Sequence, residues 1–168
     1  MVDRPARATR HFLAGPVPAE HVAAMIEAAR GTGSARNRQP WRFVVARDPA
    51  LRVALSRCGA YAQHLAGAPL VVGLAVDESS GADAHFDMGR VAQVLMGAAA
   101  GLGYGTCPAT FFPDSNVAAA GRLVGLDPPW ALRWALSVGK PAPAPDGSSG
   151  VRAIPSGRLP PGELVLEL

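Results

Sequence analysis

The chain has 168 residues, of which 49% are hydrophobic and 17% are charged, and this composition indicates a folded globular domain and excludes a disordered chain. The length suits one well-buried domain and is short for two. The net charge of +3 and the pI of 9.4 would fit nucleic-acid binding, but the arginines are scattered without interleaved aromatic residues, so we expect no nucleic-acid partner.

The cysteines and the apolar runs exclude further classes of protein. Cys58 and Cys107 lack metal-ligand spacing and cannot form a disulfide framework. The longest near-continuous apolar run, residues 66–76, contains Pro69 and is too short to cross a bilayer. The N-terminus has no apolar segment typical of a secretory signal. We therefore expect a cytoplasmic protein with no membrane partner.

An apolar stripe near the N-terminus gives the first strong periodic signal. Its members are Val22, Met25, Ile26 and Ala29. Their spacing of i, i+3, i+4 and i+7 predicts an amphipathic helix over residues 19–30.

A strand and two short helices should follow a polar loop. Because Pro40 has no N–H to give to a ladder, the strand should run over residues 41–46. Asp48 as N-cap and Pro49 as the first helical residue predict a short helix. A second short helix is expected around residues 60–65.

The middle of the chain supplies a buried strand and a long helix. Residues 69–76 are apolar without alternation, which predicts a strand buried on both faces. The helix expected over residues 84–100 is rich in alanine and glycine. Small residues let two backbones approach closely, so this helix is a candidate for the centre of the molecule or of a dimer.

Beyond this helix the signals alternate again. A strand or extended segment is expected over residues 106–112, with Pro108 interrupting it. Ser115 should cap a helix that ends near Val124. Residues 130–138 should form another strand.

The C-terminal part has a different composition. Residues 139–162 are rich in proline, glycine and serine and should be extended, and the tail at 163–168 resembles a strand that could pair with another subunit's sheet. We expect one domain over residues 1–168, in which 140–168 form an arm and strand. The whole pattern predicts an α+β fold.

The loop before the first strand carries the most distinctive polar groups. Asn37 and Gln39 offer amide donors and acceptors that could bind both edges of a flat heterocycle. An ordinary helix-to-strand loop would explain the same residues, so the loop alone does not decide between the two.

Motifs for other chemistries are missing from the sequence. It has no G-x-S-x-G elbow, no H-E-x-x-H motif and no P-loop. The histidines are far apart in the sequence, so we expect no metal site; they are His11, His21, His64 and His85. A domain without catalytic side chains, but with polar loops and arginines, favours a bound cofactor as the source of the chemistry.

A series of motifs, in order, resembles the FMN-dependent nitroreductase family. They are Arg7-Ala-Thr-Arg10-His-Phe12, Pro16-Val-Pro18, Glu27-Ala-Ala-Arg30, Ser34-x-x-Asn37-x-Gln39-Pro-Trp41-x-Phe43, Ala68-Pro69, Phe86-Asp87-x-Gly89, Ala92-Gln93, Gly101-Leu-Gly103 and Val138-Gly139-x-Pro141. The resemblance implies a nitroreductase-like mixed, largely antiparallel sheet flanked by helices. It also implies an intertwined homodimer with FMN sites at the subunit interface.

The same resemblance implies which residues bind the cofactor. Arg7, Ala8 and Arg10 would hold the flavin phosphate, the ribityl chain and the pyrimidine edge. The other subunit would contribute Ser34, Ala35, Asn37 and Gln39. Pro108, Ala109 and Thr110 would lie against the flavin ring. Arg152 from the arm would bind the phosphate, with Arg158 as the alternative.

The implied function is an oxidoreductase that passes hydride from NADH or NADPH through FMN to a small organic acceptor such as a nitroaromatic, a quinone or an enone. The chain departs from the family pattern Arg-Arg-Ser-x-Arg, because Ala6 and Ala8 replace an arginine and the serine. The connection at 77–84 is shorter than the lid of larger members, so the pocket should be open. Because of these departures, two alternatives to an oxidoreductase stay open: a flavin-binding protein with little turnover, and a structural dimer that has lost its cofactor.

Overall fold

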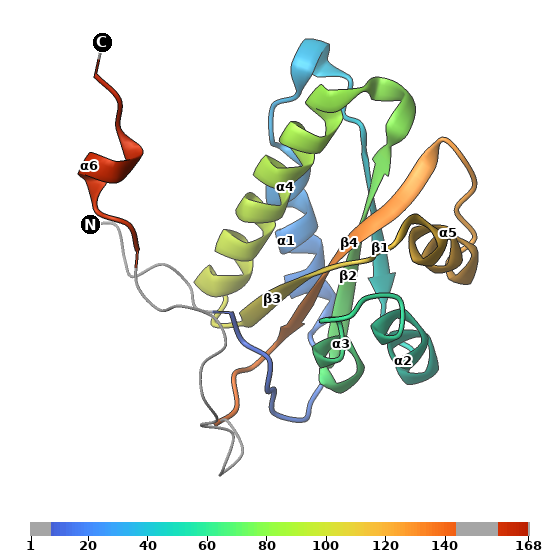
Figure 1. Cartoon of the computed structure of the whole chain (residues 1–168). Helices are drawn as coiled ribbons and strands as arrows, with labels where there is room; N and C mark the ends of the chain where they lie inside the picture. Colours follow the sequence, from blue (N-terminus) through green and yellow to red (C-terminus); the bar gives the residue numbers. More distant parts are fainter. Residues whose placement is uncertain (1–7, 144–157, 168) are drawn as a thin grey trace.

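The computed structural model describes residues 8–143 and 158–167, and its centre is a single antiparallel sheet (Figure 1). The strands are β1 (Trp41–Ala46), β2 (Leu70–Asp77), β3 (Gly105–Thr110) and β4 (Trp130–Gly139). Their order is β1-β2-β4-β3, so β1 and β3 are the edges. Every pair is antiparallel. The expected α+β fold with a largely antiparallel sheet is confirmed, and the described residues contribute no parallel pair.

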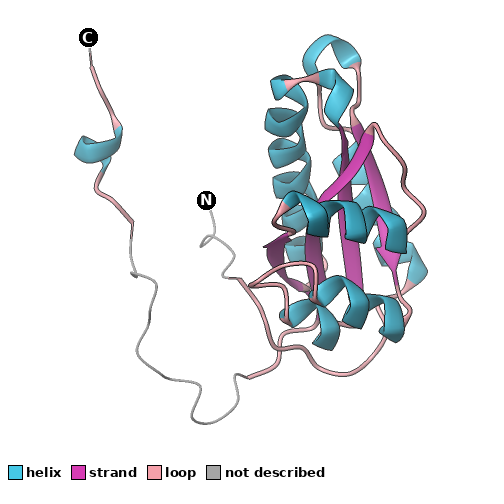
Figure 2. Cartoon of the chain, turned by 45° about the vertical axis from the view of Figure 1, so that its right-hand side comes forward, coloured by secondary structure: helices cyan, strands magenta, loops and turns pink. Residues whose placement is uncertain are grey.

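Helices cover both faces of this sheet (Figures 1 and 2). One face packs against α1 (Ala19–Arg30) and α4 (Ala82–Gly101). The other packs against α2 (Pro49–Ser56), α3 (His64–Gly67) and α5 (Asp114–Leu123). Three short turns of helix complete the described elements: η1 (Ala35–Asn37), η2 (Glu78–Ser80) and α6 (Pro161–Leu164).

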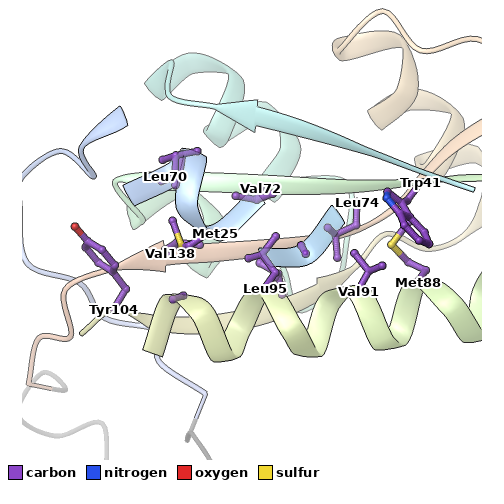
Figure 3. Close-up of a cluster of buried hydrophobic side chains, with 14 of the residues drawn as sticks. Met25, Trp41, Leu70, Val72, Leu74, Met88, Val91, Leu95, Tyr104 and Val138 are labelled. Carbon is purple, nitrogen blue, oxygen red and sulfur yellow. The ribbon is translucent and has the colours of Figure 1, made fainter. Parts of the chain in front are cut away.

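Strand β2 explains why its sequence shows no polar alternation. Leu70 and Val72 face the core beneath α1 and α4, whereas Val71 and Ala75 face the core beneath α2 and α5. Each of these side chains is fully buried. Figure 3 shows the first core, in which Leu95 of α4 lies between the helices and the sheet. The prediction of a strand buried on both faces is confirmed.

Most of the other predicted elements are confirmed within two residues. Helix α1 and strand β1 have the expected bounds, and the Asp48 carboxylate caps α2 by accepting a bond of 3.1 Å from the N–H of Ala50. The second short helix lies at His64–Gly67 rather than around 60–65. Within the described residues, no helix is long and apolar enough to span a membrane.

The predicted cap at Ser115 is wrong. Helix α5 begins at Asp114, with Pro113 as the preceding residue and no side-chain cap. The carbonyl of Pro113 accepts the first helical bond from the N–H of Asn116 at 2.8 Å. The fixed φ of proline suits this start, so the helix takes in Ser115 as an internal residue.

The strand predicted over 163–168 is also wrong for the residues that the structure describes. Helix α6 includes Glu163 and Leu164, and 165–167 have no regular structure. Pro161 is the first residue of this turn, where proline favours helix. An isolated strand is unstable without a neighbouring strand to bond, and this segment pairs with none in the described part of the chain.

Candidate functional site

The N-terminal segment lies against the ends of β3 and β4. The N–H of Thr9 donates to the carbonyl of Thr106 at 2.8 Å, and the N–H of Leu13 donates to the carbonyl of Lys140 at 2.9 Å. A Cβ at Gly105 would lie only 2.3 Å from the Thr9 hydroxyl, so only glycine allows this close approach. The segment that carries Arg10 is therefore fixed beside the edge strand.

Arg10 itself is exposed and makes no hydrogen bond or ion pair with the residues that the structure describes. Its charge acts on two groups behind the strand. Burial lowers the pKa of His64, and the positive charge of Arg10 lowers it further, against a backbone hydrogen bond with Pro108. Burial raises the pKa of Cys107, and Arg10 partly offsets that rise. Arg10 thus places an exposed guanidinium next to β3, able to bind an anionic or carbonyl group.

Edge strand β3 presents its middle residues to solvent. Pro108 and Thr110 are exposed, whereas Ala109 is buried between them. Pro108 pairs with Leu136 of β4, and Thr110 pairs with Trp134. Proline is tolerated here because an edge strand leaves one side of its backbone unpaired. Two residues of the predicted ring-binding segment, Pro108 and Thr110, are therefore accessible. Thr9, which precedes Arg10, bonds to the same strand.

An apolar slot of about 240 Å³ opens beside Pro108. Its walls come from helix α4 and from the inner face of the sheet. The lining residues are Leu74, His85, Met88, Gly89, Ala92, Pro108, Trp134 and Leu136. A flat aromatic ring system fits such a slot, because the walls are apolar and few polar groups need partners.

The second predicted half of the site is the loop before β1, which is held in an unusual backbone conformation. Arg36, Asn37 and Gln39 have φ values of 53°, 53° and 52°. Left-handed conformations cost a side-chain-bearing residue about 1 kcal/mol or more. The N–H of Gln39 donates to the hydroxyl of Ser34 at 2.9 Å, and the amide of Gln39 donates to the Asn37 side chain at 3.2 Å.

Buried Asp87 fixes this loop to helix α4. Its Oδ2 accepts from the N–H of Ala35 at 2.8 Å, and its Oδ1 pairs with Arg90 at 3.2 Å. Arg90 also donates to the carbonyl of Gly33 at 2.9 Å. The Asp87 side chain is only 3% exposed, so its bond from Ala35 is shielded from water, whereas Arg90 is 48% exposed. Asn37 and Gln39 stay exposed above this support.

The two halves lie toward opposite ends of α4 (Figure 1). The loop is tied to Asp87 in the first part of the helix, whereas the segment at Thr9 lies beside the strand that follows its last turn. From Asp87 to Ala99 the helix rises roughly 18 Å at 1.5 Å per residue. Ala8 and Arg10, on either side of Thr9, therefore lie toward the opposite end of α4 from the loop at 34–39, whereas Pro108 lines the slot together with Met88 and Gly89 of α4. Arg7 and Arg152 lie outside the described residues, and the alternative Arg158 is exposed.

A polar pair behind β3 was not predicted as part of the site. His64 Nδ1 lies 2.9 Å from the Ser137 hydroxyl, and that hydroxyl donates to the carbonyl of Cys107 at 3.3 Å. The pair supports the strand one residue before Pro108. No sequence signal reveals it, because His64 and Ser137 are far apart in the chain.

A charged network lies at the other end of the slot. His85 Nε2 is 3.0 Å from Glu78, Glu78 also pairs with Arg133, and Arg133 reaches Asp114 at 3.0 Å. Burial raises the pKa of Glu78, but the bonds from Arg133 and His85 outweigh it and hold the pKa below its usual value. Only the turn η2 separates β2 from α4 here, in agreement with the short connection expected at 77–84. No group of three or more metal-binding side chains occurs among the described residues.

Comparison with known proteins places these features in a family. Residues 4–59 and 55–140 match the model of the nitroreductase family. An NADH dehydrogenase of Thermus thermophilus is 41% identical over 81 residues, which are 48% of this chain and 39% of that protein. The chain thus matches well under half the length of this relative.

Two solved structures have the same fold over most of both chains. A predicted nitroreductase in complex with FMN, from Desulfovibrio desulfuricans, has a TM-score of 0.78 and 26% identity, covering 97% of this chain and 92% of its own. A predicted NADH oxidase of Clostridium acetobutylicum has a TM-score of 0.75 and 28% identity, covering 83% and 86%.

Proposed function

This chain belongs to the nitroreductase family, and we propose that it is an FMN-dependent oxidoreductase. It would use NADH or NADPH as electron donor and a small organic molecule such as a nitroaromatic, a quinone or an enone as acceptor. The observations that carry the proposal are the exposed guanidinium of Arg10, whose charge acts on Cys107 one residue before Pro108, and the apolar slot that Pro108 lines.

The donor set of the described residues fits this cofactor. The slot offers apolar walls for a ring, and edge strand β3 offers unpaired backbone groups for the ring's polar edge. Arg10 supplies a charged donor for a carbonyl or a phosphate oxygen. The phosphate would fall to Arg7 and Arg152, which lie outside the described residues.

The complete site would need a second copy of the chain. The amides of Asn37 and Gln39 suit the edge of a heterocycle, but they lie at the far end of α4 from Arg10. Along α4, Gly89, Gly97 and Gly101 each have open space where a Cβ would stand. We propose that α4 packs against α4 of a partner, which brings one chain's loop to the other chain's Arg10. In this dimer, residues 1–168 form one domain, and 140–168 form an arm that reaches the partner.

The residues of the chain would orient the cofactor and stabilise its charge, and the cofactor would supply the redox chemistry. When bound, FMN supplies a ring that takes up hydride from NADH or NADPH and passes it on to the acceptor. Arg10 would place positive charge beside the ring, where reduction adds negative charge. Burial lowers the pKa of His64, which favours its neutral form, and its bond with Ser137 supports the strand before Pro108. Solvent reaches the exposed residues Pro108 and Thr110, so water can supply protons to the site without a side-chain acid.

Titration and steady-state kinetics test this proposal. FMN added to the purified protein should bind, and NADH or NADPH should then bleach its visible absorption. Rates measured against donor at several acceptor concentrations should give parallel lines, because donor and acceptor use the same ring in turn. Intersecting lines, or bound FMN that neither nicotinamide reduces, would contradict the proposal.

One observation favours a second candidate, a flavin-binding protein with little turnover. The connection between β2 and α4 is only the turn at Glu78–Ser80, so no lid from this connection would hold the donor. Bound FMN that dithionite reduces but NADH and NADPH do not would support this candidate. A protein that gains no flavin absorption with excess FMN would instead indicate a dimer that has lost its cofactor.

A further inference from the structure

A second cavity lies on the opposite side of the sheet from the apolar slot. It has a volume of about 540 Å³ and is open to solvent. Its walls are the loop at 12–16, the residue that follows β1, and parts of α2 and α3. The lining residues are Phe12, Leu13, Ala14, Gly15, Pro16, Arg47, Arg52, Ala66, Gly67 and Pro69.

Two arginines give this cavity an unbalanced positive charge. Arg47 donates one Nη1 bond of 2.7 Å to the carbonyl of Val17 and forms no ion pair with the described residues. The Nε of Arg52 is buried and has no hydrogen-bond partner in the part of the chain that the structure describes. No aspartate or glutamate is among the lining residues. A buried donor without a partner is uncommon in folded proteins, and this one belongs to an arginine that lines the cavity.

We propose that this cavity binds a phosphate dianion, carried by a small organic molecule or free in solution. Two guanidinium groups balance the charge of a dianion, and their forked donors match the tetrahedral oxygens of phosphate. Beyond the arginines, the walls are mostly apolar, with Phe12, Leu13 and Pro69 among them. The volume lies in the range of small-molecule sites, so an organic body attached to the phosphate has room.

This cavity is separate from the proposed cofactor site. The apolar slot lies between the sheet and α4, whereas Arg52 belongs to α2 on the other face. Arg47 follows the end of β1, and the loop at 34–39 precedes its start. Arg10 is not among the residues that line the cavity.

Calorimetric titration of the FMN-loaded protein tests the proposal. The probes are ADP, inorganic phosphate and, as a neutral control, adenosine. ADP should bind without releasing FMN, and adenosine should bind at least tenfold more weakly. If ADP binds more tightly than inorganic phosphate, the occupant is an organic phosphate. If the two bind with equal affinity, the occupant is free phosphate. Either result supports a phosphate site.

Variants assign the binding to the two arginines. Arg52→Gln and Arg47→Gln should each weaken ADP binding about tenfold or more, whereas Arg52→Lys should recover part of that loss. Arg57→Gln is the matched control, because Arg57 ends the same helix and is exposed outside the cavity. Circular dichroism and bound FMN confirm that each variant is folded. The proposal is overturned if neither ADP nor inorganic phosphate binds, if binding displaces FMN, or if Arg52→Gln binds the probe as well as the unaltered chain does.

Discussion

The buried carboxylate of Asp87 accepts a hydrogen bond of 2.8 Å from the backbone N–H of Ala35. This bond joins the long helix α4 to the loop whose residues Arg36, Asn37 and Gln39 are held at positive φ. A strained loop persists only where its surroundings fix it. Asp87 therefore acts as the support that keeps the exposed amides of this loop in one arrangement.

Replacing Asp87 tests this support. Asp87→Ala should lower the free energy of unfolding by about 1–3 kcal/mol, because it leaves a shielded N–H without an acceptor. It should also weaken FMN binding, since Asn37 would no longer be held. Urea denaturation and FMN titration measure the two effects. Asp83→Ala, at an exposed position of the same helix, should change both by much less; equal effects of the two variants would argue against the role of Asp87.

Arg10 should contribute directly to cofactor affinity. Arg10→Gln should weaken FMN binding by roughly tenfold to a hundredfold, because a charge-assisted hydrogen bond contributes about 1.5–3 kcal/mol. Fluorescence titration of FMN measures the change. Arg122→Gln is the control, as Arg122 is exposed on α5. If Arg10→Gln binds FMN with unchanged affinity, Arg10 is not part of the FMN site.

His64 should make the protein less stable in mild acid. Its pKa in the folded state is lowered, chiefly by burial, below the usual value of 6.5. Below pH 6.5 the unfolded chain takes up a proton that the folded chain resists, so stability falls until the pH reaches the folded pKa. His64→Gln should make the free energy of unfolding less dependent on pH in this window. Urea denaturation between pH 7.5 and about 5 measures the slope, and an unchanged slope would contradict this assignment.

The face of α4 that carries the exposed Gly97 should control whether two chains form a dimer. Gly97 is exposed and has open space where a Cβ would stand, so Gly97→Phe should fold as a single chain yet obstruct helix-to-helix packing. It should sediment as a monomer and lose FMN affinity by at least tenfold. Ala118→Phe, at an exposed position on α5, should do neither. A monomeric Gly97→Phe protein that binds FMN normally would show that one chain forms the site.

The sequence predicted the elements whose signals are local. Periodicity predicted the helix at 19–30, continuous apolar character predicted the strand at 69–76, and capping chemistry predicted the helix start at Asp48-Pro49. The prediction that Ser115 caps a helix was wrong, because the helix begins directly after Pro113 without a side-chain cap. The prediction of a strand at 163–168 was wrong for the described residues. Their apolar side chains suit a strand, but no neighbouring strand bonds to them among the described residues.

The site was less accessible to local reasoning. The roles assigned to Arg10 and to 108–110 came from the family resemblance, and their proximity depends on the bond between Thr9 and Thr106. The bond between His64 and Ser137 joins α3 to β4, and no spacing in the sequence encodes it. The positive φ of Arg36 could not be predicted from the sequence either, because arginine has no special preference for positive φ.

The central claim is that each cofactor site combines Arg10 of one chain with the 34–39 loop of another. Co-expression of Arg10→Gln with Asn37→Ala, each with its own tag, tests this claim directly. Both parent proteins should bind FMN weakly. In the purified mixed dimer, one site carries both substitutions and the other carries neither, so we expect one FMN per dimer at the affinity of the unaltered protein. Mixed dimers that bind FMN no more tightly than their parents would contradict the claim.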